Sequence, residues 1–138
     1  MADQIQLEVV TPERRVLAEA VNSVTVPGRG GEMQILPGHA ALISELQAGV
    51  LSYTEGGSSA QLHVSGGFVE VNEDRVAVLA EVAERPEEID AARARAAREI
   101  AEKRLSGKSG TEIDIDRAHA KLMRNLVRLQ LASSASQR

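Results

Sequence analysis

The sequence changes its pattern at Pro86, and this change limits the possible folds more than any other feature. Before it, apolar and polar residues alternate in short runs separated by glycine, proline, asparagine and aspartate. After it, the helix-forming residues Ala, Arg, Glu, Lys and Leu predominate. Proline biases the residue before it away from helical conformation. We therefore predict two parts, a β domain over residues 1–86 and an α-helical domain over residues 87–138.

Short strands are predicted throughout the first part. Ile5, Leu7 and Val9 alternate with polar residues, which is the period-two pattern of a half-buried strand. Many short strands with regular interruptions favour an antiparallel β-sandwich or a flattened barrel. The further strand-like runs lie between turn signals at residues 16–26, 32–36, 41–46, 50–53, 61–64, 68–71 and 75–79.

Two helices are predicted in the second part, at about 90–105 and 114–131, with a loop over 106–111 and a frayed tail over 133–138. A short connection between helices of similar length predicts an antiparallel hairpin. On the second helix we expect one apolar stripe, formed by Ile115, Ala118, Leu122, Leu126 and Leu129.

The contact between these helices is expected to be thin, because the first helix offers mainly alanines. A hairpin of about 45 residues buries too little apolar surface to be stable unaided. We therefore expect another surface or a ligand to support it, and we expect two arrangements to be accessible, as a switch requires.

Composition excludes several classes of function. The 138 residues contain no cysteine, so disulfides, thiolate chemistry and cysteine zinc sites are excluded. Tyr53 and Phe68 are the only aromatic residues, so a base-stacking surface for nucleic acid is not expected. The N-terminus lacks the features of a signal peptide, and no apolar run approaches the roughly 20 residues of a membrane helix, so we expect no direct membrane insertion.

Charge is distributed unevenly around the net value of -4. Residues 1–87 carry five Lys/Arg against thirteen Asp/Glu, whereas residues 88–138 carry eleven against seven. An acidic part joined to a basic part indicates two surfaces with different partners.

The pattern I-D-x-x-R-A occurs twice, at residues 89–94 and 113–118. Aspartate is a preferred N-cap, and the preceding isoleucine can pack against the alanine one turn into the helix. Each copy therefore predicts the start of a helix.

Folding the hairpin about residues 108–109 would gather three guanidiniums at its open end, because Arg93 becomes level with Arg124 and Ile89 with Arg128. Arg124 and Arg128 repel each other, and Arg93 lies in a first turn, where the macrodipole disfavours a cation. A phosphate group would relieve both conflicts. The alternative is that the arginines are solvated, or that the counter-charge comes from nearby carboxylates, those of Glu84, Glu87 and Glu88.

No local motif supports a catalytic or metal site. The segment 107–109 ends like a phosphate loop, but Glu102 occupies the position of the required first glycine. The histidines lack metal-ligand spacing, and no Ser/His/Asp set is indicated. We expect neither a catalytic residue nor a required cofactor or metal.

Three segments together resemble the epsilon subunits of bacterial F-type ATP synthases. They are residues 31–42 (GEMQILPGHAAL), 64–71 (VSGGFVEV) and 78–80 (VLA), and the resemblance extends over the whole chain. Ala41 occupies a position where many members have proline. The resemblance implies an N-terminal β-sandwich followed by a C-terminal helical hairpin.

The resemblance also implies a function and partners. Members belong to the rotor of a proton-driven synthase, on the cytoplasmic face of the bacterial plasma membrane, and are not catalytic. The sandwich binds the gamma subunit and rests on the ring of c subunits, with Glu32 facing the c ring and His39 approaching gamma. The helices restrain ATP hydrolysis when they extend into the alpha/beta head.

Some members bind ATP in the folded hairpin as a regulatory ligand. By resemblance, the contacts here are Ile89, Asp90, Arg93 and Ala94 of the first motif copy, Arg124 and Arg128 of the second helix, and Glu84. Two alternatives remain: a purely structural coupling subunit without nucleotide binding, and a free-standing nucleotide sensor without a rotary partner.

Overall fold

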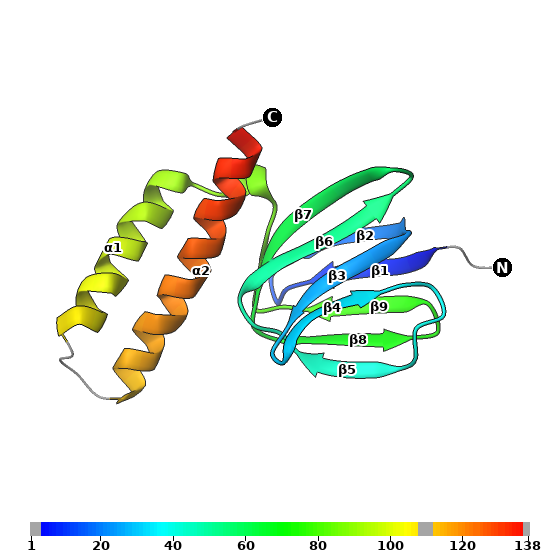
Figure 1. The fold of residues 1–138 in the computed structure, drawn as a ribbon, viewed down its shortest axis with the longest axis horizontal. Helices are drawn as coiled ribbons and strands as arrows, with labels where there is room; N and C mark the ends of the chain where they lie inside the picture. The colour runs from blue at the N-terminus through cyan, green and yellow to red at the C-terminus, as the bar shows by residue number, and fades with distance from the viewer. Residues whose placement is uncertain (1–3, 108–111, 137–138) are drawn as a thin grey trace. The chain divides into compact units, whose positions relative to one another are not determined.

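The computed structural model describes residues 4–107 and 112–136, in two compact units, Met1–Arg85 and Pro86–Arg138. The first unit is a β-sandwich and the second is a pair of helices (Figure 1). The predicted fold class is therefore confirmed. Of the loop predicted over 106–111, residues 106–107 belong to the first helix, so that part of the prediction was wrong. Residues 108–111 and the last two residues of the predicted tail lie outside the described residues.

The sandwich consists of two five-stranded sheets. The first has the order β2-β1-β9-β8-β5, and the second has the order β10-β7-β6-β3-β4. Neighbouring strands are antiparallel except for β1 and β9, which are parallel. The strands are β1 (Ile5–Val10), β2 (Arg15–Val21), β3 (Ser23–Gly28), β4 (Gly31–Ile35), β5 (Leu42–Glu45), β6 (Gly49–Glu55), β7 (Ser58–Ser65), β8 (Phe68–Asn72), β9 (Arg75–Leu79) and β10 (Val82–Glu84).

One apolar core lies between the sheets. It is built almost entirely from aliphatic residues of both sheets, as the scarcity of aromatics requires. Burying such a side chain contributes about 1.5–3 kcal/mol. The largest fully buried aliphatic residues of this core are Ile5, Leu7, Ile35, Leu51 and Leu62.

The strand predicted over residues 16–26 is two strands, because Asn22 interrupts it. The side chain of Asn22 accepts a hydrogen bond from the backbone N–H of Gly56 (2.8 Å), and its own N–H donates to the carbonyl of Thr54 (2.7 Å). β2 belongs to the first sheet and β3 to the second. Asn22 therefore marks the point where the chain passes from one sheet to the other.

Gly67 is required by the turn between β7 and β8. Its φ is +87°, and an added Cβ would lie 1.8 Å from the carbonyl oxygen of Leu79. Its own carbonyl accepts a hydrogen bond from the N–H of Leu46 (3.0 Å). Any side chain at this position would collide with the backbone, which explains why the second glycine of the segment 64–71 is required.

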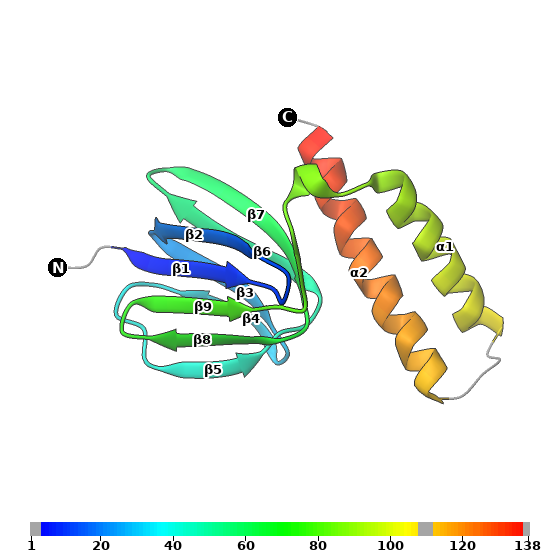
Figure 2. The ribbon, with the colours of Figure 1, turned by 180° about the vertical axis from the view of Figure 1, so that it is seen from behind.

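The second unit begins with a short 3-10 turn, η1 (Pro86–Glu88), followed by α1 (Ala91–Gly107) and α2 (Glu112–Ser136). The two helices run antiparallel and contact each other, and η1 contacts α2 (Figures 1 and 2). The predicted hairpin is confirmed. The prediction that residues 133–136 are frayed is wrong, since α2 continues to Ser136.

The predicted apolar stripe of α2 is only partly buried. Ala118 is buried, but Ile115 and Leu126 remain 37% and 41% exposed. The more deeply buried residues include Val127 and Leu131, on the side of the helix opposite Ala118. The predicted stripe therefore differs in burial along its length, and buried residues of α2 also lie on another side of the helix, which periodicity alone does not indicate.

Candidate functional site

Asp90 holds the start of α1. Its Oδ1 accepts a hydrogen bond from the backbone N–H of Arg93 (3.1 Å), and its carbonyl accepts one from the N–H of Ala94 (3.0 Å). The N–H of Ile89 donates to the carbonyl of Pro86 (3.2 Å), so η1 leads directly into the cap. The N-cap predicted at Asp90 is confirmed, whereas Asp114 of the second motif copy lies inside the first turn of α2 and is not an N-cap. Arg93 is exposed, Ile89 is half-buried and Ala94 is buried.

Arg124 and Arg128 lie one turn apart on α2, and both are half-buried. Nη1 of Arg128 donates a hydrogen bond to Oδ1 of Asn125 (3.2 Å). The amide of Asn125 in turn donates to the carbonyl of Lys121 (2.8 Å). Asn125 is only 4% exposed and restricts the orientation of Arg128. Sequence reasoning missed it, because a single asparagine among the leucines of a helix carries no distinctive signal.

The antiparallel arrangement brings these residues to one end of the hairpin. The first turn of α1, with Asp90 and Arg93, lies beside the C-terminal half of α2, which carries Arg124 and Arg128 (Figure 2). The first copy of I-D-x-x-R-A and the paired arginines thus belong to the same end of the same unit. Their role in ligand binding stays a prediction.

Glu84 belongs to the sandwich unit, where it contacts a buried histidine. Glu84 and His63 face each other across the β10–β7 ladder, and Nδ1 of His63 lies 2.8 Å from Oε1 of Glu84. Because a carboxylate accepts hydrogen bonds, Nδ1 carries the proton. His63 is fully buried, and its Nε2 has no hydrogen-bond partner among the described residues. This pair could not be predicted, because residues 63 and 84 are distant along the chain.

Glu32 lies near the start of β4, and His39 lies in the loop that follows the end of this strand. Glu32 is exposed in the β3–β4 hairpin, where Arg29 forms an ion pair with Glu45. The hydrogen bond with Glu45, together with its charge, raises the pKa of Arg29. The hairpin is held further by the backbone hydrogen bond from Arg29 to Glu45 (2.8 Å). The end that contains Glu32 is thus tied to β5.

The loop of His39 is tied to the turn between β8 and β9. The N–H of Gly38 donates to Oδ1 of Asp74 (2.7 Å), and Asp74 has a φ of +59°, a conformation that aspartate tolerates better than most residues. Nδ1 of His39 lies 2.7 Å from the carbonyl of Ala40. Leu36, at the start of this loop, is 51% exposed. His39 therefore lies in a fixed loop beside an exposed apolar side chain.

An exposed apolar strip lies on the outer face of the first sheet. It consists of Ile43, Phe68 and Leu79, which are 70%, 49% and 52% exposed, and we call it the outer strip. Phe68 pairs with Leu79 across β8 and β9. Ile43 lies on β5, beside β8. Neighbouring apolar side chains that are exposed on one face indicate a contact surface.

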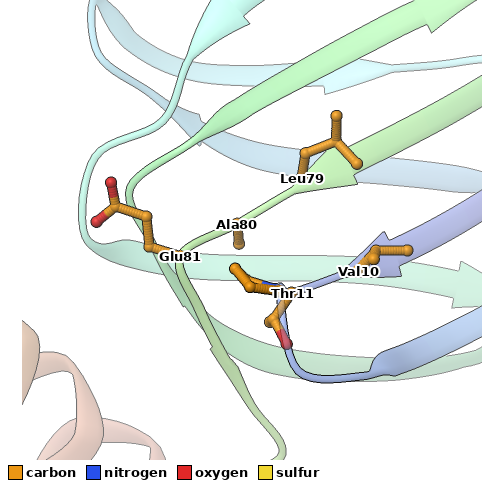
Figure 3. A pocket seen from close by; sticks show the side chains of 6 residues that line it. Val10, Thr11, Leu79, Ala80 and Glu81 are labelled. Atoms are coloured by element: carbon orange, nitrogen blue, oxygen red, sulfur yellow. The ribbon is translucent and has the colours of Figure 1, made fainter.

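A pocket of about 320 Å³ adjoins the outer strip (Figure 3). The ends of β1 and β9 form it, and the N–H of Ala80 donates to the carbonyl of Val10 (3.0 Å) to join these two segments. Its position beside Leu79 extends the apolar surface. The lining residues are Val10, Thr11, Pro12, Leu79, Ala80 and Glu81.

Residues 4–107 and 112–136 contain no helix that is both long and apolar enough to cross a membrane. In the same part of the chain, no group of three or more His, Asp or Glu side chains is arranged to hold a metal ion.

Two family models match adjoining parts of the chain. The β-sandwich domain of the ATP synthase delta/epsilon chain matches residues 4–86, and the long α-helix domain of the same chain matches residues 87–133. Together they extend over nearly the whole sequence.

Relatives of similar length have the same name. The chain is 45% identical to the ATP synthase epsilon chain of Desulforamulus reducens over 96% of its own length and 99% of that protein. It is 47% identical to the epsilon chain of Desulfitobacterium hafniense strain Y51, with 96% and 98% covered. The epsilon chain of Geobacter metallireducens is 40% identical and covered completely, as is this chain.

Solved structures agree in fold. A chain in the cryo-EM structure of the Euglena gracilis mitochondrial ATP synthase (OSCP/F1/c-ring) has a TM-score of 0.80 and 27% identity, with 99% of this chain and 82% of that chain covered. A chain in the central stalk/c-ring structure from Tetrahymena thermophila has a TM-score of 0.65 at 14% identity, which supports the fold alone, with 93% and 96% covered. The family models, the relatives and the sandwich-plus-hairpin architecture agree, and the chain belongs to the epsilon-chain family of the F-type ATP synthases.

Proposed function

We propose that this chain is a non-catalytic rotor subunit of a proton-translocating F-type ATP synthase, bound peripherally at the cytoplasmic face of the bacterial plasma membrane. It couples rotation to ATP synthesis and restrains ATP hydrolysis through its helices. The observation that carries this proposal is the division into two units of different build. The sandwich has a large aliphatic core and an exposed apolar strip, whereas the hairpin has a thin core and many cations.

The sandwich provides the contacts with the rotor in this proposal. The outer strip and the loop of His39 bind the gamma subunit, because exposed apolar surface of this kind is suited to a stable contact. Glu32, at the other end of β4, faces the c ring. Two ends of one strand thereby contact two different partners, and the rigid sandwich fixes the separation between them.

The hairpin is the regulatory element. ATP binds the folded hairpin through Ile89, Asp90, Arg93, Ala94, Arg124 and Arg128, with the guanidiniums on its phosphates. The thin interhelical contact supports this proposal, because α1 buries only alanines, Ala94 and Ala101, against its neighbours. A ligand at 100 times its dissociation constant stabilises the state that it binds by about 2.7 kcal/mol. That is enough to shift a nearly balanced pair of states strongly.

When ATP falls, the hairpin opens in this proposal. The basic residues of its helices then reach acidic segments of the alpha/beta head, and opposite charge guides the insertion. The extended helices obstruct rotation in the hydrolysis direction.

Calorimetric titration of the isolated chain with ATP, with and without Mg²⁺, tests the sensor function. Arg93→Ala and Arg128→Ala should each weaken binding about tenfold or more, since each removes a charge-assisted hydrogen bond. Lys103→Ala is the matched control, because Lys103 is an exposed cation of α1 outside the site. No heat at millimolar nucleotide, with the chain folded, would remove the sensor function.

Deletion of residues 88–138 tests the inhibitory function. The truncated chain should still assemble with gamma, because the outer strip and His39 lie in the sandwich. The reassembled complex should hydrolyse ATP faster than the complete one. Equal rates would contradict inhibition by the helices.

A purely structural coupling subunit is the second candidate, and specific contacts favour it. Asp90 already caps a helix, Arg128 already contacts Asn125, and Glu84 already contacts His63. For such a subunit, the candidate ligand residues only stabilise the fold. The titration with ATP then gives no heat, and deletion of residues 88–138 does not change the rate of ATP hydrolysis. The contact of Glu84 with ATP stays a prediction.

A further inference from the structure

The second copy of I-D-x-x-R-A, at residues 113–118, is not used by the function proposed above. Its arginine, Arg117, begins a row of cations on α2 that continues with Lys121, Arg124 and Arg128. The spacings of four, three and four residues place all of them along one side of the helix. The row therefore extends from the proposed ATP site to the opposite end of the hairpin.

On α1 a second cation lies in line with Arg93. Arg104 follows Arg93 by eleven residues, which is three turns of helix, and it occupies the last turn of α1. Because the helices are antiparallel, the last turn of α1 lies beside the first turns of α2 (Figure 1). Each end of the hairpin thus has an I-D-x-x-R-A copy, two cations four residues apart on α2, and an arginine of α1.

A pocket is present at the second of these ends. Its volume is about 330 Å³, and the described residues that line it are Arg104, Asp114, Arg117 and Lys121. All four are charged, and all four are exposed. Three cations and one carboxylate leave an excess of positive charge, even when Asp114 is paired.

The arrangement is unfavourable for an empty hairpin. Arg117 and Lys121 lie at positions i and i+4, where like charges destabilise a helix, and Arg104 adds a third cation from α1. Asp114 offsets one of these charges and also complements the macrodipole in the first turn of α2. An anion with several oxygens would offset the others, and guanidinium groups bind such oxygens in pairs.

We propose that this pocket is a second anion site, and that it binds an oligophosphate through Arg104, Arg117 and Lys121. The lining contains no apolar or aromatic side chain among the described residues to hold a base, so the phosphates are what the site recognises. The site does not depend on ATP binding at the other end of the hairpin, because it shares no residue with it.

The test uses the full-length chain and inorganic pyrophosphate as the probe, with calorimetric titration at low ionic strength. The double variant Arg117→Gln/Lys121→Gln should weaken pyrophosphate binding at least about tenfold. The control is Arg95→Gln/Lys103→Gln, which removes the same charge from exposed positions of α1 outside the pocket and should leave binding unchanged within about twofold. Circular dichroism confirms that both variants keep their helices.

A third variant separates this site from the proposed ATP site. Arg124→Gln/Arg128→Gln should weaken ATP binding but leave the pyrophosphate affinity within about threefold. An equal loss of pyrophosphate affinity in the control variant Arg95→Gln/Lys103→Gln would show that only the total charge of the hairpin matters, and would overturn the proposal. Loss of pyrophosphate binding in the third variant alone would assign the anion to the other end of the hairpin, and would overturn it too. Failure of ATP to bind at all leaves this result unaffected.

Discussion

The two units of this chain are stabilised in different ways. The sandwich buries valine, leucine and isoleucine from both sheets in one core, whereas α1 of the hairpin buries only two alanines. A buried leucine removes far more apolar area from water than a buried alanine does, and stability follows that area. The sandwich is therefore built to keep its shape, whereas the hairpin can change its shape at a low free-energy cost.

The largest effect should follow a cavity in the sandwich core. Leu51→Ala removes a fully buried side chain and should lower the free energy of unfolding of the sandwich by about 2–5 kcal/mol. Leu126→Ala on α2, where the side chain is 41% exposed, should change it by less than about 1 kcal/mol. Urea unfolding followed by the fluorescence of Tyr53, the only tyrosine in a chain without tryptophan, reports the sandwich selectively. Equal effects would contradict the comparison.

A smaller effect should follow loss of the buried pair in the sandwich. Glu84→Ala leaves Nδ1 of the fully buried His63 without this acceptor and should cost about 1–3 kcal/mol. Glu84→Gln keeps an acceptor oxygen and should cost less. The same fluorescence measurement compares the two. An equal loss in the two variants would show that the charge of Glu84, rather than its hydrogen bond, stabilises the sandwich.

The cap of α1 tests the hairpin alone. Asp90→Ala should destabilise α1 by about 1 kcal/mol, whereas Asp90→Asn should restore most of that loss, because asparagine also caps helices. Helix content is followed by circular dichroism at 222 nm, and Tyr53 fluorescence should not change. If Asn restores the helix but not the affinity for ATP, Asp90 contacts the ligand as well as the helix.

The smallest effect concerns pH. Burial, with a further contribution from Glu19, raises the pKa of the Tyr53 hydroxyl, although Arg85 opposes this. The folded state then holds the phenolic proton more tightly than the unfolded state does. The resulting contribution to the free energy of unfolding is fully present below about pH 10 and is lost as pH rises through the raised pKa. Tyr53→Phe should flatten the fall of Tm above about pH 10, measured by circular dichroism. An identical fall in both proteins would contradict a role for Tyr53.

Most of the sandwich could be predicted because alternation and turn residues are local signals. The division at Asn22 could not, because a continuous strand-like run does not show where the chain changes sheets. β10 was missed because Glu81–Glu88 reads as an acidic connection, although Val82–Glu84 pairs with β7. The strands that pair are distant in sequence, and the apolar pattern of one strand does not indicate which other strand it pairs with.

The candidate sites divide in the same way. The helix cap at Asp90 is a local feature, and the sequence predicted it. The contacts of Arg128 with Asn125 and of Glu84 with His63 depend on side-chain directions that only the fold determines. The cluster at the second end of the hairpin could not be predicted, because Asp114 and Arg117 belong to a motif that locally indicates only a helix start, and Arg104 lies on the other helix.

The shortness of β10 has a consequence for aggregation. β10 is the edge strand of its sheet, and its three residues pair with residues 63–65 at the end of the eight-residue strand β7. If β10 detaches, the backbone groups of β7 that it covered become a template for another chain. The hydrogen bond between Glu84 and His63 therefore also helps to keep β10 paired with β7. A chain that loses this hydrogen bond should form strand-paired dimers or larger assemblies before it unfolds.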